Sequence, residues 1–142
     1  GRYDIVLIDC PPALNILTVN ALVAADRVIV PMQCEYFALE GLSALIGTME
    51  QVRSAVNPGL QIFGVLRTMF DGRNRLSQEV SQQLEAHFGD TMFNTVIPRN
   101  VRLAEAPSHG LSAIAYDPGS SGAQAYVELA QEMMQRMMEA PA

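Results

Sequence analysis

The sequence predicts an α/β protein with three layers, in which helices cover both faces of a mostly parallel sheet. The first observation is that short apolar runs rich in β-branched residues alternate with longer amphipathic stretches, the order of βαβ units. The second is that these runs lack apolar–polar alternation, as expected for strands buried on both faces. With 142 residues, 49% of them hydrophobic, the chain is large enough for one domain with a true core.

Four apolar runs predict the buried strands. They are residues 3–8 (YDIVLI), 27–32 (RVIVPM), 61–69 (QIFGVLRTM) and 93–97 (FNTVI). Proline cannot donate a hydrogen bond to a sheet ladder, so we expect the second strand to end near Pro31 and the fourth at Pro98. A short edge strand is also expected at 113–116.

The amphipathic stretches predict helices over 17–25, 38–56, 76–88 and from about 121 to 138. In the second of these, leucines and other apolar residues recur at i, i+3, i+4 and i+7, and Asn57-Pro58-Gly59 follows as a stop signal. Residues 101–110 are expected to be turn-rich or a short helix. The domain is predicted to span 1–138, with a frayed tail at 139–142.

The charge distribution limits the classes of function. The net charge of −6 argues against a protein that coats DNA with its whole surface. All nine basic residues are arginine, so this chain supplies no phosphate-binding lysine and no Schiff-base lysine. The basic charge is concentrated in one segment, which contains Arg67, Arg73, Arg75, Arg99 and Arg102. All of these except Arg67 can form a phosphate-binding patch, or a solvated face with local ion pairs; both interpretations stay open at this point.

Unusual polar residues gather where the predicted strands end. In a parallel sheet, ligands bind at the carboxyl ends of the strands, which correspond here to residues 9–12, 31–35, 68–75 and 98–102. Asp9 follows the first apolar run, where a carboxylate can hold a water bound to Mg²⁺. The alternative is an aspartate that caps a turn. These stretches predict the site at one edge of the sheet.

The sequence gives little support for a catalytic thiol, a catalytic triad, a metal site or a membrane segment. Cys10 and His109 lie far apart in the sequence with no sign of thiolate activation, and Ser108 has no evident partner for a catalytic triad. The two histidines and two cysteines show no metal-ligand spacing, and both thiols are expected to be reduced. No apolar run reaches the roughly 20 residues of a membrane helix, and no signal peptide is evident, which predicts a cytoplasmic protein without membrane contact.

Four long strings resemble one family. They are YDIVLIDCPPALNILTVNAL, VPMQCEYFALEGL, TMFDGR and IPRNVRLAEAPSHG. From about residue 3 to 138 they resemble the ParA/Soj chromosome- and plasmid-partitioning ATPases, of the deviant Walker A class that includes MinD. That family carries a lysine-rich phosphate loop, K-G-G-x-G-K-T-T/S, which this chain lacks. The resemblance therefore implies the C-terminal half of a P-loop NTPase-like domain, which binds ATP and Mg²⁺ only together with the other half and is inactive as an ATPase alone.

The resemblance also assigns roles to particular residues. Asp9 matches the Walker B aspartate, which orients Mg²⁺ through a water. The switch loop that senses the γ-phosphate matches Cys10, Pro11 and Pro12. Glu35 resembles a glutamate that reaches the nucleotide sugar across the dimer. The adenine pocket matches Met69, Phe70, Pro98 and Asn100, where Asn100 or a nearby backbone group reads the base edge. Nonspecific DNA binding matches Arg73 and Arg102, with Arg75 as a third member.

The resemblance implies a cycle of chromosome or plasmid segregation at the nucleoid. ATP binding closes a homodimer, which joins two arginine patches and turns on nonspecific DNA binding, because affinity rises steeply with the number of phosphate contacts. A ParB-type partner then stimulates hydrolysis. One alternative is a naturally truncated, nonenzymatic module that binds DNA or a partner. Another is a sister ATPase that positions other cargo, against which Arg73 and Arg102 argue.

Overall fold

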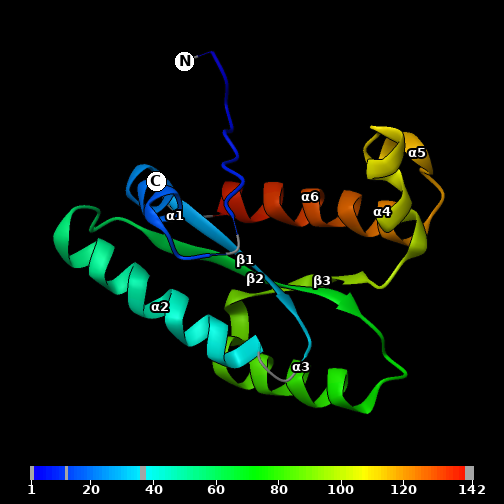
Figure 1. Ribbon diagram of the computed structural model, residues 1–142, viewed down its shortest axis with the longest axis horizontal. Helices are drawn as coiled ribbons and strands as arrows, with labels where there is room; N and C mark the ends of the chain where they lie inside the picture. The colour runs from blue at the N-terminus through cyan, green and yellow to red at the C-terminus, as the bar shows by residue number, and fades with distance from the viewer. Residues whose placement is uncertain (1, 12, 36–37, 140–142) are drawn as a thin grey trace. The chain divides into compact units, whose positions relative to one another are not determined.

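A computed structural model describes residues 2–11, 13–35 and 38–139 and confirms the α/β class (Figure 1). In chain order the longer elements are α1 (Ile16–Ala24), β1 (Arg27–Gln33), α2 (Ala38–Ala55), β2 (Gln61–Phe70), α3 (Arg75–Phe88), β3 (Met92–Pro98) and α6 (Ser121–Glu139). The short helices are η1 (Gly89–Thr91), α4 (Val101–Glu105), η2 (Ala106–His109) and α5 (Ala113–Tyr116). The described strands form a sheet of order β1-β2-β3, and β2 pairs with β3 in parallel.

The chain divides into two compact units, and the first comprises residues 1–28 and 39–63. Its core is formed by Leu22 of α1, Met49 and Val52 of α2, and Leu60 before β2. The Asn57 side-chain amide donates to three carbonyl oxygens near the end of α1, at 2.8 to 3.2 Å. The turn after α2, read from the sequence as a stop signal, therefore also fastens the end of α1.

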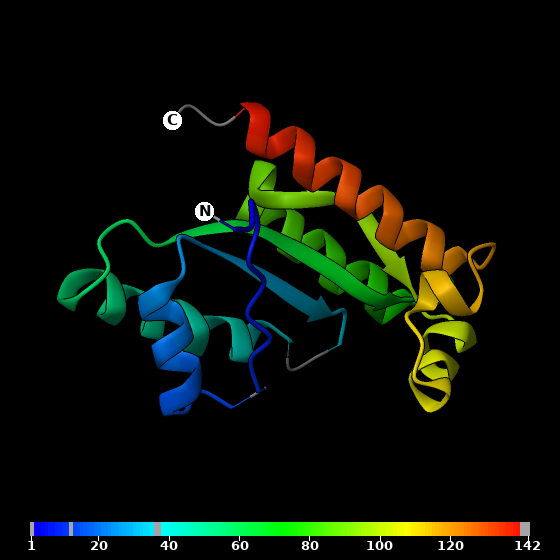
Figure 2. The same cartoon turned by 90° about the horizontal axis from the view of Figure 1, so that it is seen from above.

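The second unit comprises residues 29–38 and 64–142. Within it, α3 and α6 lie on opposite faces of β3 (Figures 1 and 2). Phe93 of β3 is fully buried, and its ring occupies the space beside Gly64 of β2, where an added Cβ would lie 2.3 Å from a ring carbon. On the other side, the Glu132 carboxylate of α6 accepts the backbone N–H groups of Asn94 and Thr95 at 2.8 and 2.9 Å. These contacts hold the layers of this unit together.

The predicted strand at 3–8 is wrong. This segment has no regular secondary structure, and its apolar side chains are exposed: 77% for Leu7 and 51% for Ile8. A strand needs a neighbouring strand to satisfy its backbone N–H and C=O groups. The sheet formed by the described residues consists of β1, β2 and β3. The run 3–8 therefore has the composition of a buried strand but does not pair with the sheet.

The expected edge strand at 113–116 is also wrong, because these residues form the helix α5. The Ser112 hydroxyl accepts the N–H of Ala115 at 3.2 Å, and the N–H of Asp117 donates to the Ala113 carbonyl, so a capped turn satisfies the backbone locally. The strand expected at 27–32 agrees to within one residue, because β1 ends at Gln33, two residues after Pro31.

The remaining expected helices and strands agree with the structure to within one or two residues. The stretch 101–110 is a short helical connection, as anticipated, and consists of α4 and η2. Of the expected tail, Glu139 is the last residue of α6, and 140–142 lie outside the described residues. Over the described part of the chain, no helix is both long and apolar enough to cross a membrane.

Candidate functional site

The carboxyl ends of β2 and β3 lie together in the second unit. Phe70 is the register partner of Pro98, and the N–H of Arg99 donates to the Phe70 carbonyl at 3.0 Å. Because the pairing is parallel, the loop after β2 and the loop after β3 emerge at the same edge. The structure thus brings together two of the four stretches that the sequence singled out, 68–75 and 98–102.

An open, largely apolar groove of about 440 Å³ lies at this edge. It is lined by Thr68, Met69, Ile97, Arg99, Asn100, Val101, Leu103, Ala104 and Tyr126. Of the four residues expected in the adenine pocket, Met69 and Asn100 line the groove, whereas Phe70 and Pro98 form the register pair next to it. The volume falls in the usual range for small-ligand pockets. Leu103 and Tyr126 were missed by sequence reasoning because their helical spacing marks them only as packing residues.

Met69 has an unusual backbone conformation. Its φ of 53° lies in the left-handed region, and it is the one non-glycine residue with positive φ in the described part of the chain. For a residue with a Cβ this conformation costs energy and persists only where the surroundings impose it. Such strain clusters at ligand-binding sites, and here it falls on a residue that lines the groove.

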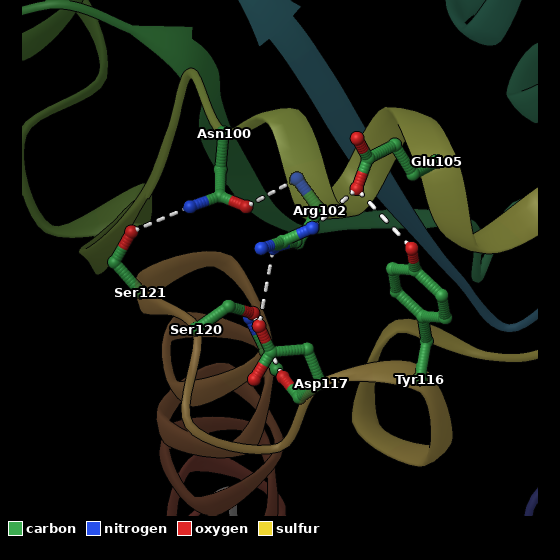
Figure 3. A network of polar contacts seen from close by, with 8 residues as sticks. Asn100, Arg102, Glu105, Tyr116, Asp117, Ser120 and Ser121 are labelled. Carbon is green, nitrogen blue, oxygen red and sulfur yellow. Dashed lines mark hydrogen bonds and ion pairs between the residues drawn. The ribbon is translucent and has the colours of Figure 1, made fainter.

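The Asn100 side chain is engaged by the protein itself. Its Oδ1 accepts the N–H of Arg102 at 2.9 Å, which caps α4, and its Nδ2 donates to the Ser121 hydroxyl at 2.8 Å (Figure 3). These bonds use one of its two amide hydrogens and one of its two oxygen lone pairs. Asn100 therefore fixes one wall of the groove and keeps one amide hydrogen for a ligand. Its reading of a base edge stays a prediction.

Arg102 is held by two carboxylates (Figure 3). Its Nη1 donates to Glu105 Oε2 at 2.8 Å, and its Nε lies 3.3 Å from Asp117 Oδ2. The Tyr116 hydroxyl donates to the same Glu105 oxygen at 3.3 Å. The hydrogen bond from Arg102 lowers the pKa of Glu105. Sequence reasoning missed Glu105, Tyr116 and Asp117; the i, i+3 spacing of Arg102 and Glu105 was the available signal.

The other exposed arginines of this segment also face carboxylates. The backbone N–H, Nε and Nη2 of Arg73 all donate to Asp71 at 3.0 Å, and these hydrogen bonds lower the pKa of Asp71 to about 2. Arg75 Nε donates to Glu79 at 2.9 Å. Arg73 and Arg75 side chains are 92% and 91% exposed, so solvent and any polyanion can reach them.

Two further arginines differ from these. Arg99 lies 3.9 Å from Glu35, so Glu35, expected at a nucleotide sugar, faces an arginine of its own unit. Arg67 is mostly buried, and its guanidinium donates to Ser81, Glu85 and the Phe93 carbonyl between β2, β3 and α3. Arg67 is therefore a packing arginine and does not belong to the exposed group.

Asp9 and the expected switch loop lie in the first unit. Asp9, Cys10 and Pro11 are exposed in an irregular segment, and Pro12 lies outside the described residues. The Thr18 hydroxyl of α1 is within 2.8 Å of the Ala13 carbonyl and 3.5 Å of the Pro11 carbonyl, which ties this loop to α1.

The residues around Asp9 do not build a metal site by themselves. The described residues contain no cluster of three or more histidine, cysteine or acidic side chains that could hold an ion. Mg²⁺ in nucleotide sites commonly uses one or two carboxylates, with waters and phosphates as the other ligands. Asp9 fits the role of one such carboxylate, whereas a metal cage made from this chain alone does not fit.

Comparison with known proteins identifies relatives over almost the whole chain. The chromosome partitioning protein ParA of Caulobacter vibrioides is 57% identical over 136 residues, which are 96% of this chain and 51% of the relative. The chromosome-partitioning ATPase Soj of Thermus thermophilus is 56% identical over 97% of this chain and 55% of the relative. The chain thus spans about half the length of the curated relatives it matches. A family model described as an AAA domain matches residues 1–62.

Solved structures match the fold over a similar extent. Cobyrinic acid a,c-diamide synthase from Mycobacterium smegmatis, with bound ADP and magnesium, has a TM-score of 0.78 and 33% identity over 98% of this chain and 50% of that chain. The septum site-determining protein MinD of Pyrococcus horikoshii, complexed with Mg-ADP, has a TM-score of 0.74 and 26% identity over 100% of this chain and 55% of that chain. The expected α/β class, related to about half of a MinD-type fold, is thereby confirmed.

Proposed function

Because this chain is a partial homologue of the ParA/Soj chromosome-partitioning ATPases, we propose that it forms the C-terminal portion of an ATPase that segregates a chromosome or plasmid. The observation that carries this proposal is the identity of 48 to 57% with ParA and Soj proteins over more than nine-tenths of the chain. The whole cycle of nucleotide binding, dimerisation and DNA binding belongs to the proposal.

The groove at the ends of β2 and β3 is the proposed place for the adenine base. Its apolar lining suits the faces of an aromatic ring, and Met69 and Asn100 supply a thioether and an amide hydrogen. Phe70 and Pro98 then support the groove from the neighbouring register pair. ADP with magnesium in the related Mycobacterium smegmatis structure supports nucleotide binding by this fold.

The remaining nucleotide contacts are proposed for other segments. Asp9 holds a water of the Mg²⁺ ion, Cys10, Pro11 and Pro12 form the phosphate-sensing loop, and Glu35 approaches the sugar. Bound ATP and Mg²⁺ supply the phosphoryl group and its charge neutralisation. This chain contributes the base site and one carboxylate, and it contributes no phosphate lysine because it contains no lysine.

Nonspecific DNA binding is proposed for Arg73, Arg75 and Arg102, which are exposed near the same edge. A guanidinium binds phosphate oxygens without reading the base sequence. An ATP-bound homodimer would present two such groups of arginines, and the affinity would rise with the number of phosphates contacted. A ParB-type partner would then stimulate hydrolysis and release the dimer from the nucleoid.

A chimaera tests the proposal. The chain replaces the half that it matches in Caulobacter vibrioides ParA, and ATP hydrolysis and duplex DNA binding are measured for the chimaera and for the chain alone. We expect the chimaera to hydrolyse ATP and to bind DNA in an ATP-dependent way, while the chain alone does not hydrolyse ATP. A folded chimaera that binds neither nucleotide nor DNA would contradict the proposal.

The second candidate is a nonenzymatic module that binds DNA or a protein partner. The exposed side chains of Arg73 and Arg75 favour it, because a guanidinium can contact a phosphate without a bound nucleotide. In the same experiment, this function predicts that the chain alone binds DNA as tightly as the chimaera and that ATP changes neither affinity.

A further inference from the structure

Around two of the arginines proposed to bind DNA, the negative charges outnumber the positive charges. Arg73 is neutralised by Asp71, and Arg102 lies between two carboxylates, Glu105 and Asp117. Counting full charges, these two arginines face three acids within 3.3 Å. As it stands, this surface is not an attractive patch for a polyanion.

The carboxylates also occupy the hydrogen-bonding positions that a phosphate needs. Asp71 receives Nε and Nη2 of Arg73, which is the edge of the guanidinium that binds a carboxylate or phosphate with two parallel hydrogen bonds. Around Arg102, Nε faces Asp117 and Nη1 faces Glu105. A DNA phosphate must therefore replace a carboxylate of this chain to bind Arg73 through that edge.

These ion pairs can be exchanged readily. The Arg73 side chain is 92% exposed and the Arg102 side chain is 51% exposed, and exposed pairs contribute little net stability because water screens them. The carboxylates therefore do not block the arginines permanently. Each carboxylate instead reduces the binding free energy that a contact between its arginine and a DNA phosphate would contribute.

We propose that Asp71, Glu105 and Asp117 are internal competitors of DNA phosphate for Arg73 and Arg102, and that they keep the DNA affinity of one subunit low. This inference rests on the proposed function, since it concerns the same arginines. It gives a reason why binding would depend on joining two subunits: each contact is weak, and only their number makes the complex stable. The three carboxylates would set the affinity for DNA without touching it.

The amides of matching shape test this inference. Asp71→Asn, Glu105→Gln and Asp117→Asn remove one negative charge each but keep an oxygen that accepts the hydrogen bonds from Arg73, Tyr116 and Arg102. Glu128→Gln is the matched control, because Glu128 is an exposed acid of α6 with no ion pair in the described residues. The dissociation constant for a nonspecific duplex is measured for the chimaera at a fixed salt concentration, with and without ATP.

We expect each of the three amide variants to bind DNA about 2- to 5-fold more tightly than the unmodified chimaera, the range that corresponds to an exposed ion pair. The change should exceed that of Glu128→Gln, and the triple variant should bind detectably without ATP. Affinity that is unchanged, lower, or raised only as much as in the control overturns the inference; lower affinity would mean that the carboxylates position the arginines.

The same series separates this inference from the proposed function. If the double variant Arg73→Ala/Arg102→Ala binds DNA as well as the unmodified chimaera, the proposed DNA site itself is wrong. If that double variant loses binding but the amide variants do not gain it, only the inference fails. Thermal melting followed by circular dichroism checks that each variant is folded. If Asp117→Asn unfolds the α5–α6 connection, the DNA affinity of Glu105→Gln alone decides whether the inference holds for Arg102.

Discussion

The segment before α1 is irregular and exposed, whereas the edge formed by the ends of β2 and β3 is held by a network of hydrogen bonds and ion pairs. The segment carries a strong sequence signal, an apolar run followed by Asp9-Cys10-Pro11, yet these residues are irregular and exposed. The edge carries a concentration of arginines where two predicted strands end, and its residues form a connected network of hydrogen bonds and ion pairs. The residues of the edge find their hydrogen-bond and ion-pair partners within the second unit. The segment 3–8 would need a neighbouring strand to satisfy its backbone groups, and the described sheet consists of β1, β2 and β3.

The largest expected effect tests whether Asp9 functions despite this exposure. In the chimaera, Asp9→Ala should lower ATP hydrolysis by about 100-fold or more, because the positioning of Mg²⁺ supplies much of the stabilisation of the transferred phosphoryl group. Asp4→Ala, which removes a carboxylate from the same exposed segment, is the control and should hydrolyse ATP normally. Equal turnover in both variants would remove Asp9 from the site.

The next effect concerns the edge. Arg73→Ala/Arg102→Ala should weaken DNA binding of the chimaera by at least about 10-fold and reduce the slope of log affinity against log salt by about 2 per subunit, since two phosphate contacts are lost. ATP binding should be retained. Arg2→Ala removes the same charge from the other region and should leave the slope as it was. An unaltered slope in the double variant would contradict the assignment.

A smaller effect tests packing in the two units. Gly64→Ala places a methyl group against the Phe93 ring and should lower the free energy of unfolding by about 1–3 kcal/mol. Gly47→Ala in α2 meets no atom within 4 Å and should raise the stability of that helix by about 0.5–1 kcal/mol. Urea denaturation of the chain measures both. Similar effects of the two substitutions would show that β2 and β3 do not pack as described.

The smallest effect is a titration. The pKa of Asp71 is lowered to about 2 by Arg73, with a further contribution from Arg99, so its folded value lies below the value of 3.8 for an unpaired aspartate. A lowered pKa means that the stability contributed by the carboxylate is present above pH 4 and is lost as the pH falls towards 2. In Arg73→Ala, the pKa of Asp71 measured by NMR should rise from about 2 towards 3.8 but stay below it, because the backbone N–H of residue 73 and Arg99 still lower it. A pKa that stays near 2 would mean that Arg73 does not hold this carboxylate.

Several parts of the candidate site were readable from the sequence. Prolines and polar residues after apolar runs located the ends of β2 and β3. The resemblance assigned Met69 and Asn100 to one pocket, and both line the groove; their binding of adenine stays a prediction. Asp117, one of the two carboxylates around Arg102, was not readable, because it approaches through the turn before α6, and a turn sequence does not reveal which side chain it faces. Leu103 and Tyr126 likewise became groove residues only when α4 and α6 met.

Local patterns were enough for most of the elements. Helical periodicity placed α2 and α3, and Asn57-Pro58-Gly59 placed the end of α2, because stop signals act on neighbouring residues along the chain. Composition did not determine the secondary structure of residues 3–8 or 113–116. The first segment would form a strand only beside another strand, and the second forms a helical turn capped by Ser112. Hydrogen bonds within a helix join residues four apart, whereas those of a sheet join distant segments. The tertiary structure therefore decided which apolar run became a strand and which arginines met a distant carboxylate, as Arg102 meets Asp117 and Arg99 meets Glu35.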